Sequence, residues 1–124
     1  MDRKKFFKRL AYLILFIFLV NFFANKFYWY SSIWYFDIIM HFLGGFWVGL
    51  VFFWLFSIEI SLRLVLQIMI GVLLIGVSWE IFEFFFNNYL TQNPFSISDT
   101  ASDIFFDLFG GLCAILYLWK KLPR

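Results

Sequence analysis

The sequence has little of several residues on which soluble and secreted domains depend. One cysteine among 124 residues excludes an internal disulfide and a zinc site built from cysteines. Only 15% of the residues are charged, and the net charge of +2 supplies no extended basic surface for phosphate backbones. We therefore expect no nucleic-acid partner. There is also a single histidine, His41, so any imidazole chemistry must use that residue.

Apolar and aromatic residues are abundant instead. The chain is 64% hydrophobic and 27% aromatic, which is more apolar surface than a soluble domain of this size could bury. We predict an all-α polytopic membrane protein whose residues 1–124 form one transmembrane domain. Its four spans are expected at about residues 8–24, 34–56, 64–88 and 100–119, since about 20 residues cross a bilayer. The first span resembles a signal peptide, but Phe22 replaces the small residue that cleavage needs, so we interpret the segment as a retained helix.

The basic residues predict how the chain is oriented. With four spans, the two termini and the break at 57–63 share one side of the membrane. Nine of the ten Lys and Arg residues lie on that side, and Lys26 alone lies on the other. The positive-inside rule therefore places both termini in the cytoplasm, and we expect a bacterial cytoplasmic (inner) membrane.

The start of the fourth span carries a column of acids. Asp99, Asp103 and Asp107 are four residues apart and would share one face of a helix. An ionised side chain at the centre of a bilayer costs roughly 2.5–3.5 kcal/mol, so such residues usually face a protein interior and carry function. Asp99 also occupies the expected N-cap position, with Thr100 and Asp103 completing a capping box, which makes it the weaker site candidate.

Other spans deliver ionisable groups to the same depth. At about 1.5 Å per residue, the predicted topology puts all of them within the outer half of the membrane. One layer holds Asp37, Glu83 and Asp103, and a deeper layer holds His41, Glu80 and Asp107. Six of the eight acids in the chain converge there, counting Asp99.

The second and fourth spans share an internal pattern. Residues 36–45 and 102–111 align without gaps on the frame Asp-x3-His/Asp-x2-Gly-Gly. Both copies run from outside to inside, so we expect two helical hairpins related by an axis along the membrane normal. The glycine pairs should let helix backbones approach closely below the polar layer.

So many carboxyl groups cannot all be ionised and unpaired inside a membrane. Either several share protons or a cation holds them together. The oxygens suit Mg²⁺, Mn²⁺ or Ca²⁺, and an imidazole suits Zn²⁺ or Mn²⁺. Candidate ligands of such a divalent metal are His41, Glu80, Asp103 and Asp107, with Asp99 less favoured. The alternative is acid–base catalysis in which Asp37 or Glu80 holds His41.

These motifs resemble those of known small membrane proteins. The order Asp37-x3-His41-Phe-x2-Gly, Glu80-x2-Glu83 and Asp99-Thr-x2-Asp103-Ile with a glycine pair resembles the YjdF-type small bacterial membrane proteins. It is also similar to the VanZ-like family and the wider lipocone-like group over residues 34–117. That resemblance implies action on lipid headgroups or lipid-linked cell-wall precursors. Asp107 departs from it, because the VanZ pattern has Asn there and the YjdF pattern a small residue.

The sequence thus leads to one main functional hypothesis and two alternatives. The main hypothesis is an enzyme that hydrolyses or transfers a phosphate-linked headgroup of a lipid or polyprenyl carrier. Its candidate catalytic residues are His41, Glu80, Asp37 and Glu83, the last two as orienting groups. The alternatives are a cation- or proton-binding small transporter, for which a homo-oligomer is one option, and a non-catalytic lipid-binding protein.

Overall fold

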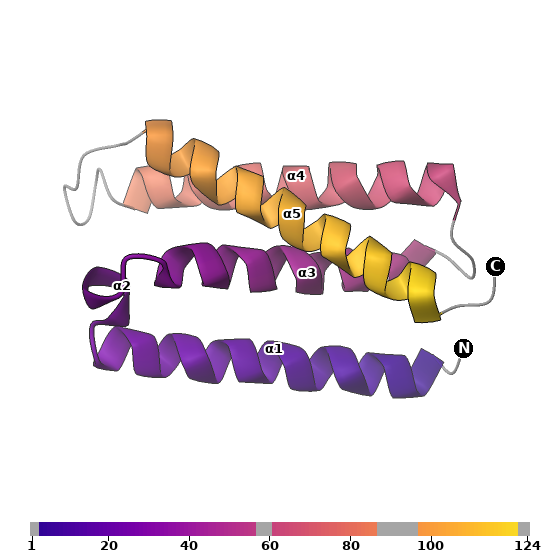
Figure 1. Ribbon diagram of the computed structural model, residues 1–124, viewed down its shortest axis with the longest axis horizontal. Coiled ribbons are helices and arrows are strands. Elements are labelled where there is room, and N and C mark those ends of the chain that lie inside the picture. Colours follow the sequence, from indigo (N-terminus) through magenta and orange to yellow (C-terminus); the bar gives the residue numbers. More distant parts are fainter. Residues whose placement is uncertain (1–2, 57–60, 87–96, 122–124) are drawn as a thin grey trace.

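The computed structural model describes residues 3–56, 61–86 and 97–121 (Figure 1). These residues form helices α1 (Arg3–Lys26), α2 (Trp29–Ser32), α3 (Phe36–Phe56), α4 (Leu62–Phe86) and α5 (Ile97–Lys121). All but α2 are long and apolar enough to cross a membrane. The expected fold class, a four-helix membrane bundle, is confirmed.

The helix boundaries differ from the expected spans in ways that matter for the site. Helix α5 begins at Ile97, so Asp99 lies within its first turn and the N-cap assignment was wrong. An acid in the first turn is still favourable, because it faces the positive end of the helix dipole. Arg63 lies inside α4 and not in the preceding break. The expected end of the third span, at residues 87–88, lies outside the described residues. Residues 57–60 of the expected break and residues 89–96, between the third and fourth spans, also lie outside them.

A short helix that the sequence did not predict connects α1 to α3. Tyr28 precedes α2 in a left-handed backbone conformation, with φ 60°, which turns the chain sharply. Ser32 then donates its hydroxyl hydrogen bond to the carbonyl oxygen of Tyr28 at 2.8 Å. This end of the bundle, where α1 ends and α3 begins, is called the α2 end below.

The four long helices form two antiparallel pairs, α1 with α3 and α4 with α5. Figure 1 shows α3 and α5 running in the same direction and crossing each other, with the start of α1 and the end of α5 at the end opposite α2. Helix α3 is central, since it packs against α1, α4 and α5. Within the described ranges no Cα atom of α1 lies within 8 Å of one of α4 or α5.

Glycines allow the close crossing of α3 and α5. A Cβ atom on Gly45 would overlap the backbone of Asp107, and one on Gly110 would overlap the backbone of Phe42. These glycines belong to the two copies of the repeated pattern, so both copies meet at one interface. The first copy's other glycine, Gly44, is aligned with Gly110, yet a Cβ there would meet nothing within 4 Å.

On the side of this crossing away from α2, the interior of the bundle is apolar. The largest fully buried side chains are Phe53, Ile68, Leu118 and Val72. Helix α1 is attached to the edge of this core by tryptophans of α3. Trp47 Nε1 donates to the carbonyl oxygen of Leu10 at 2.8 Å, and Trp54 Nε1 donates to that of Arg3 at 3.2 Å.

The glycine crossing predicts a stability difference between two aligned positions. Gly110→Ala should lower the free energy of unfolding by about 1–3 kcal/mol, because an overpacked backbone contact forces the helices apart. Gly44→Ala, the matched control, should unfold like the wild type. Thermal unfolding in detergent, followed by circular dichroism, measures both. Equal midpoints for Gly110→Ala and Gly44→Ala would contradict the crossing.

Candidate functional site

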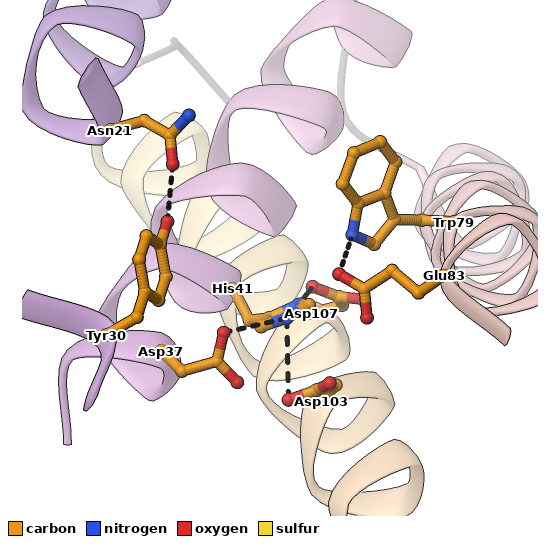
Figure 2. Close-up of polar contacts among 8 residues, drawn as sticks. All are labelled: Asn21, Tyr30, Asp37, His41, Trp79, Glu83, Asp103 and Asp107. Atoms are coloured by element: carbon orange, nitrogen blue, oxygen red, sulfur yellow. Dashed lines mark hydrogen bonds and ion pairs between the residues drawn. The ribbon is translucent and has the colours of Figure 1, made fainter. Parts of the chain in front are cut away.

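His41 lies at the centre of the polar cluster, on the first half of α3. Its Nδ1 is 3.0 Å from Asp107 Oδ1 of α5. Its Nε2 is 3.4 Å from Asp103 Oδ1 and 3.5 Å from Asp37 Oδ1. Figure 2 shows the three carboxylates arranged around the single imidazole ring. The cluster is largely buried, since the side chain of His41 is 10% exposed and that of Asp103 is 4% exposed.

The two ring nitrogens have different surroundings. The Nδ1 distance is that of a good hydrogen bond. In the tautomer with the proton on Nδ1, this N–H donates and Asp107 Oδ1 accepts. The Nε2 contacts are longer than the usual 2.7–3.2 Å or so of an N–H···O bond. Asp37, His41 and Asp103 each offer one possible ligand atom, and these three atoms lie within 4.8 Å of one another. This geometry fits either an imidazolium among carboxylates or a cation shared by three ligands.

A second acidic group lies beside the first. Glu80, Glu83 and Asp103 also bring one oxygen each within 4.8 Å of one another. Glu83 is held by Trp79, whose Nε1 donates to Glu83 Oε1 at 2.8 Å (Figure 2). Glu80 is buried, and its Oε1 has no hydrogen-bond partner among the described residues. Asp103 belongs to both groups and connects them.

Helical spacing and one glycine explain why these groups converge. Asp37 and His41 of α3 are four residues apart, as are Asp103 and Asp107 of α5, so each pair occupies one face. Gly76 of α4 lies against the Asp107 carboxylate, and a Cβ there would come within 2.7 Å of its Oδ2. A larger residue at position 76 would therefore push α4 away from the cluster.

The cluster forms part of the wall of a pocket of about 540 Å³. Four of its acidic and histidine residues line this pocket, namely Asp37, His41, Glu83 and Asp107. Toward the middle of the bundle the lining becomes apolar and includes Ile17, Met40, Val48, Val72 and Ile75. Helices α1 and α4 both supply lining residues, and none of the described lining residues is Lys or Arg.

The α2 end of the pocket is bordered by a tyrosine and an asparagine. Tyr30 of α2 donates its hydroxyl hydrogen to Asn21 Oδ1 of α1 at 2.6 Å (Figure 2). Partial burial, with the carboxylates of Asp37 and Glu83 nearby, raises the pKa of Tyr30 to about 12. The phenol therefore stays neutral at physiological pH and acts as a donor here.

The structure brings together all six residues of the two expected layers, but not in the expected pairs. Asp107 makes the short contact with His41, whereas the sequence favoured Asp37 or Glu80 for that position. The two candidate metal groups include Asp37 and Glu83 and leave out Asp107. Exposed Asp99 belongs to neither group. Sequence reasoning missed Trp79, although its spacing of four residues from Glu83 could have indicated the contact.

Comparison with known proteins gives a family but no activity. A family model described as "Predicted membrane protein (DUF2238)" matches residues 1–124. The chain belongs to this family. No curated protein and no solved structure shows significant similarity to the chain. The DUF2238 description agrees with the four membrane-crossing helices and says nothing about a reaction or a substrate.

The contact between His41 and Asp107 predicts a spectroscopic change. Because His41 is the only histidine, selective ¹⁵N-histidine labelling reports on this ring alone. Asp107→Asn replaces a charge-assisted hydrogen bond with a weaker neutral one, so the Nδ1 proton signal should move upfield or disappear through exchange. Asp99→Asn, which removes an exposed acid two turns earlier on α5, should leave the spectrum as it is. An unchanged ring spectrum in Asp107→Asn would refute the contact.

Proposed function

We propose that this protein is a membrane enzyme that hydrolyses or transfers a phosphate-linked headgroup of a lipid or polyprenyl carrier. The reaction takes place in the outer half of a bacterial inner membrane, at the α2 end, with both termini in the cytoplasm. A divalent cation held by Asp37, His41 and Asp103 is part of this proposal. The resemblance to VanZ-like and YjdF-type proteins supports the same class of substrate.

The observation that carries the proposal is the arrangement of His41 in the pocket wall. Asp107 fixes Nδ1, so Nε2 is presented toward two carboxylate oxygens. In protein metal sites a coordinating histidine usually donates its other N–H to a carboxylate, which sets its tautomer and orientation. Asp107 would thus orient the His41 ring, and Asp37 and Asp103 would bind the metal together with Nε2.

The donor set fits a hard or borderline divalent ion. Two carboxylates and one imidazole suit Mn²⁺ or Zn²⁺, and the oxygens also accept Mg²⁺ or Ca²⁺. Such an ion, when bound, supplies a positive charge that polarises a phosphoryl oxygen. This role is needed because no Lys or Arg among the described residues lines the pocket to bind an anionic headgroup. The protein's part is to orient His41 through Asp107 and to hold the Glu83 carboxylate at the pocket wall through Trp79.

The shape of the pocket supports a lipid substrate. Its polar wall lies at the α2 end, and its apolar lining continues down α1, α3 and α4 toward the bundle centre. A headgroup beside His41 could therefore keep its hydrocarbon chain against Ile17, Val48 and Val72. Both α1 and α4 line the pocket while their backbones stay more than 8 Å apart, so that chain could enter between them from the bilayer.

The transport alternative has less support. A conducting path needs polar groups that continue across the membrane. On the side of the cluster away from α2, the described core is formed by apolar residues that include Leu50, Phe53, Ile68, Ala114 and Leu118. The arrangement favours a pocket that is open on one side only.

The first prediction of this proposal concerns turnover. Purified protein in liposomes of bacterial phospholipids, with a polyprenyl diphosphate added in a parallel set, should release a phosphate-containing product detectable by ³¹P NMR. His41→Ala should reduce turnover by at least about 100-fold. Asp107→Asn, which alters only the orienting group, should reduce it about 10- to 100-fold. Chelation of divalent ions should stop turnover in the wild type.

Ser78→Ala is the control for this assay. Ser78 is exposed on α4 and donates within its own helix to the carbonyl oxygen of Leu74. Its loss should leave turnover unchanged. No turnover of either substrate by the wild type, or full turnover by His41→Ala, would exclude the proposed activity.

The second prediction concerns substrate access. Gly44→Leu should fill the pocket without disturbing the helix packing, because a Cβ at this position meets no atom within 4 Å. We expect an increase in KM of about 10-fold or more with an unchanged melting temperature. Gly110→Ala should show the opposite pattern, with a lower melting temperature. If KM stays unchanged in Gly44→Leu, the pocket is not the lipid site.

A further inference from the structure

We infer that Glu80, Glu83 and Asp103 form a second cation subsite, which shares Asp103 with the subsite of His41. This inference deepens the proposed function, on which it rests, by assigning two divalent ions to the site instead of one. The first ion is held by Asp37, His41 and Asp103. The second has carboxylate ligands only.

Glu80 gives the independent reason for a second ion. Its side chain belongs to α4, faces the bundle interior and is only 7% exposed. Its Oε1 has no hydrogen-bond partner in the described part of the chain. A buried carboxylate oxygen without a donor is strongly unfavourable, so either a proton or a cation should satisfy it. The nearest ligand atoms of Glu83 and Asp103 lie within 4.8 Å, which leaves room for an ion among them.

Contacts with neighbouring residues orient the carboxylates of this subsite. Trp79 holds Glu83 Oε1, which fixes the orientation of that carboxylate. Asp103 faces His41 through Oδ1, and its carboxyl also lies within hydrogen-bond distance of that of Glu80, so either a shared proton or a cation would join the two. A set of carboxylate oxygens without nitrogen or sulfur favours a hard cation such as Mg²⁺ or Mn²⁺.

Charge balance also favours two ions. The two groups contain four carboxylates, those of Asp37, Asp103, Glu80 and Glu83. One divalent ion would leave two of these negative charges uncompensated in a poorly solvated place, whereas two divalent ions balance all four. Asp107 lies outside both groups, and the hydrogen bond with His41 stabilises its carboxylate without neutralising it.

A shared carboxylate would set the two ions at a catalytically useful distance. In two-metal phosphoryl-transfer sites the ions lie about 3.5–4 Å apart and stabilise both the attacking and the leaving oxygen. A phosphate-linked headgroup could span such a pair from the pocket, since Asp37, His41 and Glu83 all line it. The second subsite therefore narrows the substrate to a phosphate ester or diphosphate.

The test is the stoichiometry and spin coupling of bound Mn²⁺ in the full-length protein, purified in detergent. We expect two Mn²⁺ per chain and an electron paramagnetic resonance spectrum of a coupled pair. The double variant Glu80→Gln with Glu83→Gln should bind only one Mn²⁺ per chain, and the spectrum of this ion should show no coupling. His41→Ala should instead weaken the other subsite, and Asp103→Asn should abolish the coupling. Each single variant, Glu80→Gln or Glu83→Gln, should weaken the binding of one of the two ions about 10-fold or more.

Asp99→Asn is the matched control, because it removes an acid of α5 that lies outside both groups, and it should keep two coupled ions. One uncoupled Mn²⁺ in the wild type, unaffected by Glu80→Gln and Glu83→Gln, would overturn the second subsite and leave the proposed function standing. No bound Mn²⁺ would overturn both cation subsites and indicate carboxyl groups that share protons. The melting temperature of every variant distinguishes lost binding from lost folding.

Discussion

The structure depends on one constraint, that carboxylates inside a membrane-spanning bundle must be compensated. Asp37, Glu80, Glu83, Asp103 and Asp107 meet around one imidazole, from three helices that are distant in sequence. Spread over the lipid-facing surface, each would carry its own cost of burial in hydrocarbon. Gathered in the interior, they can share His41, protons or cations. The convergence of α3, α4 and α5 at the α2 end follows from this need.

Small residues make the convergence possible. Where α3 crosses α5, Gly45 of α3 lies against the backbone of Asp107. Helix α5 can therefore carry an acid at the crossing and still pack closely against α3. Gly76 gives the same freedom to α4 beside the Asp107 carboxylate. The aligned glycines of the two copies have different roles, since Gly110 packs and Gly44 faces the pocket. One repeated pattern thus supplies both the close contact and the adjacent space.

Helix number and the grouping of the acids could be predicted because hydropathy and helical periodicity are local properties. The pairing of Asp107 with His41 could not, because four-residue spacing places Asp37 just as close to the ring along the same helix. Only the rotation of α5 about its axis decides which carboxylate meets Nδ1, and that rotation depends on packing at Gly45 and Gly110. The N-cap assignment of Asp99 failed for a related reason. Ile97 and Ser98 already belong to α5. Ser98, Asp99 and Thr100 are all preferred N-cap types, so the sequence alone does not select the start of the helix.

The position of α1 leaves a pocket beside the buried polar cluster, which the proposed lipid substrate would need. Trp47 and Trp54 attach the first half of α1 to α3, and Tyr30 contacts its second half through Asn21. Between these attachments α1 borders the pocket, and no Cα atom of α1 lies within 8 Å of one of α4 in the described residues. Protein thereby covers the acids on the α5 side, while on the other side the pocket between α1 and α4 continues along an apolar lining. A site for a soluble ligand would not need an apolar extension toward the bundle centre, whereas a site for a lipid would.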